Sequence, residues 1–253
     1  MRIAIITGAS SGLGRAFAIQ IAKTREVDEL WVIARREERL RELASNIPIA
    51  VRPLAFDLGH TGSIKEIERL LDEEKPDVRY LVNAAGFGKF GNYNDLTHEE
   101  SLGMLDINVR ALINITLSVL PYMSRGGRLL QIASTSAFQP LPGFNIYAAT
   151  KAFIVSYTKS LKWELFNRGI HVTAVCPGWI KTEFMQIAID SKNGNLVKHF
   201  WLALSPTWVA RWALLGNKLG FAVVTCAPHN FIHRIFAKIL PSWLIISLWR
   251  ILR

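Results

Sequence analysis

The sequence predicts an α/β protein with one large domain, residues 1–226, and a C-terminal extension, residues 227–253. Short apolar, β-rich runs alternate with helical patterns along the large domain. The first of these runs leads into a glycine-rich turn and then into a helix. Apolar residues make up 50% of the 253 residues, which is enough for a large core and excludes a disordered or fibrous chain.

The first strand is expected at residues 3–7 (IAIIT), which lead into TGASSGLG and a helical pattern as far as Ala22. Glycines in such a strand–turn–helix unit let the backbone approach a ligand, and the N–H groups at the helix start attract a pyrophosphate. A glycine-rich turn can also be no more than a turn. In this context we predict a dinucleotide site that includes Gly8, Ser10, Ser11, Gly12, Leu13 and Gly14.

The second strand, residues 30–34, is followed by Arg35 and Arg36 instead of an acid. An acid at this position usually holds the ribose 2′-hydroxyl of NAD, whereas Arg accommodates the 2′-phosphate of NADP. The pair therefore favours NADP(H), with Arg35 as the main contact and Arg36 assisting; NAD(H) is the alternative cofactor. A solvated helix start is the alternative interpretation of this charged stretch.

Two further strands are followed by small and polar residues. Strand 49–55 precedes Asp57, which could accept a hydrogen bond from an adenine amino group or cap the next helix, at 62–74. Strand 80–82 leads into Asn-Ala-Ala-Gly, where small residues let the backbone pass close to a cofactor. We assign to the cofactor site Asp57, Leu58, Asn83, Ala84 and Gly86.

A long amphipathic helix is predicted from about His98 to Tyr122, with Asn108 in its apolar middle. A buried Asn needs hydrogen-bond partners, so this residue either belongs to the site or is bonded to backbone within the core.

The central stretch, STSAFQPLPGFNIYAATK, extends from Ser134 to Lys151. It follows an apolar strand at 127–133 and enters a helix that begins at Tyr147 and ends near Arg168. Tyr147 and Lys151 have i,i+4 spacing and therefore share a helix face. An adjacent ammonium lowers the pKa of a phenol, so we expect a Tyr that exchanges a proton with a substrate and a Ser134 hydroxyl that polarises a carbonyl. Exposed helix neighbours are the alternative for the Tyr–Lys pair.

The last third of the large domain begins with a strand at 170–175. Pro177, Gly178, Ile180 and Thr182 follow it, and we place them against an amide group of the ligand. The apolar and aromatic stretch 183–205 is interpreted as a substrate lid. A helix from Pro206 to Leu219 and a last strand from Phe221 to Thr225 are expected next.

The net charge of +10 comes mainly from the end of the chain, because residues 191–253 contain eight Lys and Arg and no acid. Pro241 divides the extension into two amphipathic pieces that carry Trp and basic residues, a composition that suits a membrane surface. The alternative is that their apolar face packs on the domain or on a second subunit. Nucleic-acid binding is not expected, since the basic residues lie among apolar ones.

Cysteine, histidine and hydropathy patterns add little chemistry. Cys176 and Cys226 are expected to be reduced core residues, and the scattered histidines predict no metal site. Neither a secretory signal nor a membrane-spanning segment is apparent in the sequence, so we expect a cytoplasmic protein, with peripheral membrane contact through the extension as the variant.

The motifs TGASSGLG, NAAG and YAATK, together with Asn108, Ser134 and PGWIKT, resemble those of the short-chain dehydrogenase/reductase family over residues 1 to about 185. The resemblance implies a doubly wound, Rossmann-type parallel sheet of seven strands that binds NAD(P)(H). It also implies catalytic roles for Asn108, Ser134, Tyr147 and Lys151. Tyr147 would transfer the proton, Lys151 would lower its pKa and bind the nicotinamide ribose, and Asn108 would hold a relay water. The extension, which replaces the family's usual C-terminal Val-Asp-Gly-Gly segment, is similar to bacterial ketoacyl and hydroxysteroid reductases.

These observations lead us to expect an NADP(H)-dependent oxidoreductase that reduces a carbonyl, or oxidises a secondary alcohol, of a hydrophobic small molecule. We expect a homodimer or a tetramer. A non-catalytic dinucleotide-binding regulator or membrane-surface scaffold is the alternative, although both Tyr147 and Lys151 are present.

Overall fold

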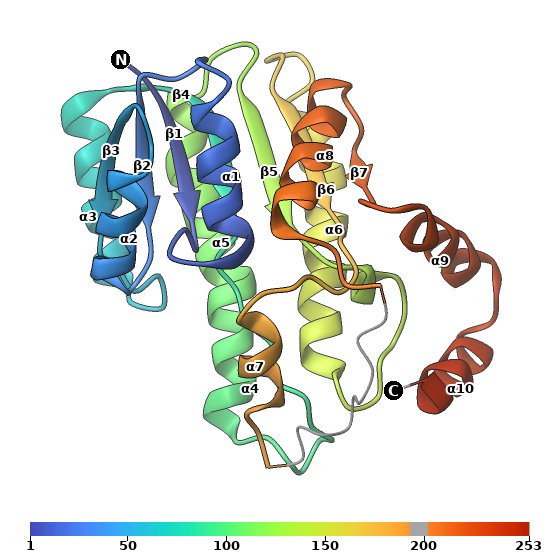
Figure 1. Cartoon of the computed structure of the whole chain (residues 1–253). Helices are drawn as coiled ribbons and strands as arrows, with labels where there is room; N and C mark the ends of the chain where they lie inside the picture. Colours follow the sequence, from blue (N-terminus) through green and yellow to red (C-terminus); the bar gives the residue numbers. More distant parts are fainter. Residues whose placement is uncertain (193–201, 253) are drawn as a thin grey trace.

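The computed structural model describes residues 1–192 and 202–252 and contains one parallel sheet of seven strands (Figure 1). The strand order is β3-β2-β1-β4-β5-β6-β7, so the direction of winding reverses between β1 and β4. In such sheets ligands bind at the carboxyl ends of the strands around this switch point. The strands are β1 (Arg2–Thr7), β2 (Glu29–Ile33), β3 (Ala50–Leu54), β4 (Asp77–Asn83), β5 (Arg128–Ile132), β6 (His171–Val175) and β7 (Val223–Val224).

Helices cover both faces of the sheet, because the strands present apolar side chains on both of these faces. Ala4 and Ile6 of β1 pack in a layer with α1, α2 and α8, whereas Ile3 and Ile5 pack with α3, α5 and α6. Figure 1 shows these two helical layers in front of and behind the sheet. The Rossmann-type fold predicted from the sequence is therefore confirmed. The helices are α1 (Gly12–Ala22), α2 (Glu37–Ser45), α3 (Thr61–Glu74), α4 (His98–Leu105), α5 (Leu112–Val119), α6 (Asn145–Glu164), α7 (Phe184–Ile189), α8 (Pro206–Lys218), α9 (Pro228–Ile239) and α10 (Ser242–Leu252), with short 3₁₀ turns η2 (Leu120–Tyr122) and η3 (Thr135–Phe138).

The helix predicted between His98 and Tyr122 is interrupted by one π-helical turn, η1 (Asp106–Ala111), which contains Asn108. Among the described residues, this stretch of 25 residues is the one helix long and apolar enough to span a membrane by length and composition alone. Ile115 and Val119 of this stretch are fully buried against the sheet. We therefore assign it as a core helix.

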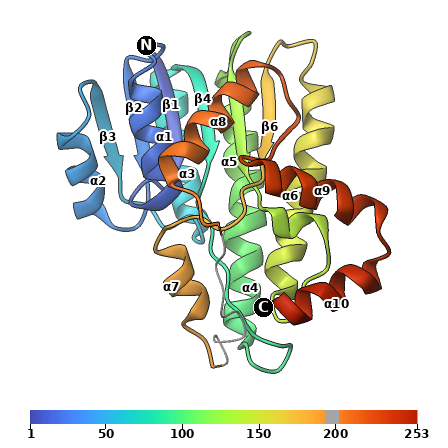
Figure 2. The same ribbon diagram turned by 45° about the vertical axis from the view of Figure 1, so that its right-hand side comes forward.

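The chain departs from the predicted elements mainly near its end. The last strand is only two residues long, shorter than the predicted Phe221–Thr225, because Phe221 is exposed and only Val223 and Val224 pair with β6. The extension forms two helices separated at Pro241, as the sequence predicted. Both lie at one side of the molecule, beyond α6 (Figures 1 and 2).

Candidate active site

A cavity of about 1190 Å³ lies at the carboxyl ends of the central strands. Its walls come from the glycine-rich turn after β1, the loops after β2 to β6, the start of α6, and helices α7, α9 and α10. All residues predicted for the site line it except Asn83 and Asn108. Residues 193–201 of the predicted lid are outside the described part of the chain.

The turn after β1 brings backbone close to the cavity. Gly8 has a φ of +67°, and a Cβ at this position would lie 2.8 Å from the backbone of Ala84. Thr7 Oγ1 accepts hydrogen bonds from the N–H groups of Ala84 and Ala85, each at 3.0 Å, and so fixes the loop after β4 beside the turn. Gly12, at the start of α1, has a φ of +52° and faces Thr182. This narrow cradle at a helix N-terminus fits a dinucleotide pyrophosphate.

Asn83 and Asn108 shape the cavity from behind instead of lining it. Asn83 Nδ2 donates to Thr116 Oγ1 and Gln131 Oε1, both at 3.0 Å, so its side chain belongs to the core and departs from the predicted role in cofactor binding.

The Asn108 side chain clamps the backbone of Phe87. Its Oδ1 accepts from Phe87 N–H at 3.0 Å, and its Nδ2 donates to Phe87 C=O at 2.9 Å and to Thr150 Oγ1 at 3.1 Å. A Cβ on Gly86 would lie 2.7 Å from Asn108 Oδ1, so the clamp requires glycine there. Asn108 thus connects the π-helical turn, the loop after β4 and α6.

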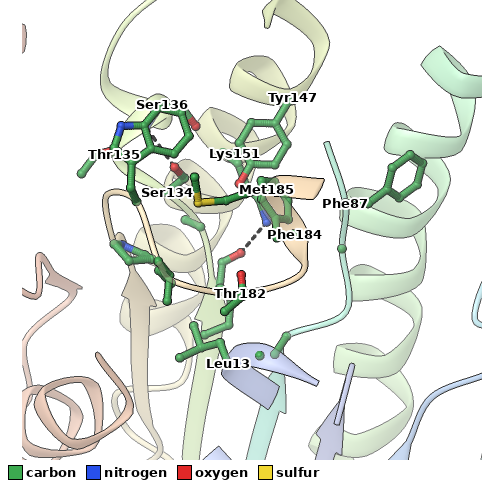
Figure 3. Close-up of a pocket in the computed structure, with 18 of the residues that line it drawn as sticks. Leu13, Phe87, Ser134, Thr135, Ser136, Tyr147, Lys151, Thr182, Phe184 and Met185 are labelled. Atoms are coloured by element: carbon green, nitrogen blue, oxygen red, sulfur yellow. Dashed lines mark hydrogen bonds between the residues drawn. The ribbon is translucent and has the colours of Figure 1, made fainter. Parts of the chain in front are cut away.

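Ser134, Tyr147 and Lys151 lie together on one wall of the cavity (Figure 3). Ser134 follows β5, and the other two residues lie on the first turns of α6. Lys151 Nζ is 5.5 Å from the centre of the Tyr147 ring and donates a hydrogen bond of 2.7 Å to Ile132 C=O at the end of β5. The shared helix face expected from the spacing is therefore present.

Burial has the largest effect on the pKa values of Tyr147 and Lys151. Burial raises the pKa of the Tyr147 phenol well above its usual value, and a hydrogen bond with Ser134 opposes this shift only in part. Burial also lowers the pKa of Lys151 to about 8. The sequence-based expectation that the nearby ammonium lowers the pKa of the phenol is thus not met in this structure, because removal from water dominates both groups. Tyr147 is consequently a protonated phenol near neutral pH.

The two arginines after β2 differ in how firmly they are held. Arg36 donates to Ser10 Oγ at 3.1 Å and to Ser11 Oγ at 2.9 Å, beside the glycine-rich turn. Its other amino group forms an ion pair of 2.8 Å with Glu183. Arg35 is more exposed and lies 3.9 Å from the Asp57 carboxylate. Arg36, more than Arg35, is therefore fixed where the end of β2 meets the turn.

Asp57 has a local role as well. Its Oδ1 accepts a hydrogen bond of 2.9 Å from Gly59 N–H, which forms a turn before α3. The N-cap of α3 is His60, so Asp57 does not cap that helix. The carboxylate still lines the cavity.

Aromatic side chains surround the phenol. Phe144 stacks on Tyr147 with ring centres 4.2 Å apart, and Phe184 of α7 lies 5.4 Å from the same ring. Phe90 and Trp179 extend this cluster. The start of the predicted lid therefore forms part of an apolar wall next to Tyr147.

The extension supplies wall residues that the sequence reasoning missed. Asn230 of α9 is buried against Gly178, where a Cβ would lie 2.6 Å from its Oδ1, and His233 Nε2 is 2.8 Å from Gln139 Oε1. Trp249 Nε1 of α10 donates to Pro142 C=O at 3.0 Å. A signal was available, since Asn230 and His233 are spaced to share a helix face.

No metal chemistry is supported in the described part of the chain, which contains no group of three His, Cys, Asp or Glu residues able to hold an ion. Both cysteines are buried and free, as expected.

The doubly wound sheet, the glycine cradle and the buried Ser–Tyr–Lys wall define a dinucleotide-dependent oxidoreductase. Residues 2–193 match the family model of the short chain dehydrogenases, and the chain belongs to this family.

Three similar proteins illustrate the relationship. The NADP-dependent 3-hydroxy acid dehydrogenase of Schizosaccharomyces pombe is 33% identical over 205 residues, which is 77% of this chain and 79% of that protein. A short-chain dehydrogenase from Sphingobium yanoikuyae in complex with NADPH has a TM-score of 0.80 and 26% identity, over 95% of this chain and 96% of that one. The 3-ketoacyl-(acyl-carrier-protein) reductase from Brucella melitensis, complexed with NADH, has a TM-score of 0.72 and 26% identity, over 95% and 94%.

Proposed function

We propose that the protein uses NADP(H) to reduce a carbonyl, or to oxidise a secondary alcohol, of a hydrophobic small molecule. The observation that carries the proposal is the buried Tyr147 phenol, which stands between Ser134 and Lys151 on one side and aromatic side chains on the other. When bound, the nicotinamide supplies or accepts the hydride.

The residues of this wall have separate tasks. Tyr147, protonated because burial raises the pKa of its phenol, donates a proton to the substrate oxygen in the reductive direction. Ser134 donates a hydrogen bond to the same oxygen and holds the carbonyl in place. The Lys151 ammonium, fixed by Ile132 C=O, stabilises the phenolate that remains after the proton has left.

The preference for NADP(H) rests on Arg36. Its guanidinium is held by Ser10 and Ser11 next to the glycine-rich turn, and the Nη1 N–H that is not paired with Glu183 can donate to a 2′-phosphate. The similar Schizosaccharomyces pombe enzyme is an NADP-dependent dehydrogenase, which supports this preference, whereas NADH in the Brucella melitensis structure leaves NAD(H) as the competing cofactor.

A hydrophobic substrate is proposed because apolar side chains dominate the substrate end of the cavity. Phe144 and Phe184 flank the phenol, and the extension adds Leu240, Ile245 and Trp249. A long-chain acyl or a polycyclic ketone has the size and polarity for such walls.

The proposal is tested by measuring NADPH oxidation with a panel of ketones that ranges from small and polar to long-chain and polycyclic. We expect turnover with the hydrophobic members and a higher kcat/KM with NADPH than with NADH. Turnover of polar aldehydes alone would contradict the substrate class, and equal use of NADH would contradict the cofactor preference.

We also propose a homodimer. Helices α4 and α6 are neighbours, and together with α5 they expose large apolar side chains that a second copy could cover. Sedimentation analysis of Leu117→Arg tests this, since a dimer that uses this face should dissociate; an unchanged mass would exclude the face. The exposed apolar residues of this face are Leu102 and Leu105 of α4, Leu117 of α5 and Phe153 of α6.

A further inference from the structure

Helix α9 has three polar side chains turned toward the domain, whereas its large apolar side chains are exposed. Asn230 is buried against Gly178, His233 contacts Gln139, and Arg234 lies over the Phe138 ring. A surface helix of a globular protein normally buries its apolar face instead. The alternative that the apolar face of the extension packs on its own domain therefore does not hold for α9.

The outer surface of the extension is strongly apolar. The side chains of Ile239, Trp243 and Ile251 are 72%, 69% and 78% exposed, and each projects from α9 or α10. Exposed apolar surface of this extent marks an interaction site. The large apolar residues exposed on the two helices are Phe231, Ile232, Ile235, Phe236, Ile239, Trp243, Leu248 and Ile251.

The charge of this region restricts the partner. Residues 202–252 contain no acid, and Lys238 and Arg250 are exposed at the ends of α9 and α10, next to the apolar side chains. Basic residues that flank exposed aromatic and aliphatic ones suit an anionic lipid surface. A second copy suits it less, because a two-fold contact brings like charges together and the extension offers no acid to pair them.

The helices are too short to cross a bilayer. Helix α9 has 12 residues and α10 has 11, so each is about 16–18 Å long, against about 30 Å for a hydrocarbon core. Helices with basic residues beside exposed aromatic and aliphatic side chains lie in the plane of the interface.

We propose that α9 and α10 dock the protein onto an anionic phospholipid surface, with their outward apolar side chains inserted below the headgroups. The same two helices form a wall of the active-site cavity, and Phe236 and Leu248 both line the cavity and are exposed to solvent. Docking therefore places the cavity mouth at the membrane, where an apolar ketone or alcohol partitions. Only the delivery of this ketone or alcohol from the membrane rests on the proposed function.

Vesicle co-sedimentation of the full chain tests docking without any turnover. We expect binding to phosphatidylcholine vesicles that contain phosphatidylglycerol, weaker binding to phosphatidylcholine alone, and partial release by high salt. Lys238→Ala should weaken binding about fivefold, the effect of one basic residue near a charged surface. Ile239→Asp and Trp243→Asp should each weaken it at least about tenfold.

Trp163→Asp is the matched control, because Trp163 of α6 is 74% exposed and lies outside the extension. It should bind vesicles like the unmodified protein. Thermal unfolding and NADPH affinity, measured for every variant, distinguish lost docking from lost folding. Absence of vesicle binding by the folded full chain would overturn the proposal. Vesicle binding by Trp243→Asp equal to that of the unmodified protein would also overturn it. A change in oligomer mass caused by Trp243→Asp, without any lipid binding by the unmodified protein, would overturn it as well.

Discussion

Replacement of Lys151 by Met should change how the stability of the protein depends on pH. The ammonium is buried, and burial lowers its pKa from 10.5 to about 8 in the folded protein. The unfolded chain therefore binds more protons than the folded protein between these two values, and stability rises with pH across this window. Met has similar length and no charge, so the variant lacks this contribution.

The expected size follows from the two pKa values. Between pH 7 and pH 9.5 the unmodified protein should gain about 2 kcal/mol of unfolding free energy relative to Lys151→Met. At pH 7 the same two pKa values make the buried ammonium cost about 3 kcal/mol of unfolding free energy relative to the neutral amine.

Urea denaturation of both proteins at the two pH values, without cofactor, measures the difference. Changes common to both proteins cancel, because only one side chain distinguishes them. Parallel pH profiles would refute the reasoning and show that Lys151 is solvated in the folded protein.

Four further substitutions test the site. Gly86→Ala should lower the unfolding free energy by about 1–3 kcal/mol in denaturation experiments, because the new methyl group would overlap Asn108 Oδ1; unchanged stability would contradict the clamp. Asn108→Ala leaves the part-buried backbone N–H and C=O of Phe87 unpaired, so we expect lower stability and weaker NADPH binding by titration calorimetry; unchanged stability and affinity would contradict the role of Asn108. Arg36→Ala should raise the KM for NADPH at least about tenfold with little effect on NADH, and Arg35→Ala should do less; the reverse order would restore Arg35 as the main contact.

Local patterns in the sequence were sufficient to predict most of the fold. Strand 3–7 with its glycine-rich turn, and the i,i+4 pair of Tyr147 and Lys151, are encoded within a few neighbouring residues. Helical and strand periodicities are likewise local properties, which explains why the seven strands and the two helices of the extension could be predicted.

What could not be predicted depends on contacts between distant segments. The π-helical turn at Asn108 forms where its side chain reaches Phe87, and helical periodicity carries no sign of it. The pKa of Tyr147 depends on how deeply the fold buries it, whereas the sequence showed only the nearby charge. Arg35 and Arg36 are adjacent in the chain, so only the position of Ser10 and Ser11 shows which guanidinium is held at the turn.

The orientation of α9 was equally hidden. Its periodicity predicted an amphipathic helix, but the direction of the apolar face depends on the packing of Asn230 against Gly178 and on the contact of His233 with Gln139.

In the proposed mechanism, the buried phenol of Tyr147 donates the proton to the substrate oxygen. The most direct test is Tyr147→Phe, assayed for NADPH oxidation with the best ketone of the panel and for NADPH affinity by titration calorimetry. We predict a loss of about 10²–10⁴-fold in kcat with unchanged NADPH affinity, because only the proton is removed. Turnover at the rate of the unmodified protein would exclude Tyr147 as the proton donor.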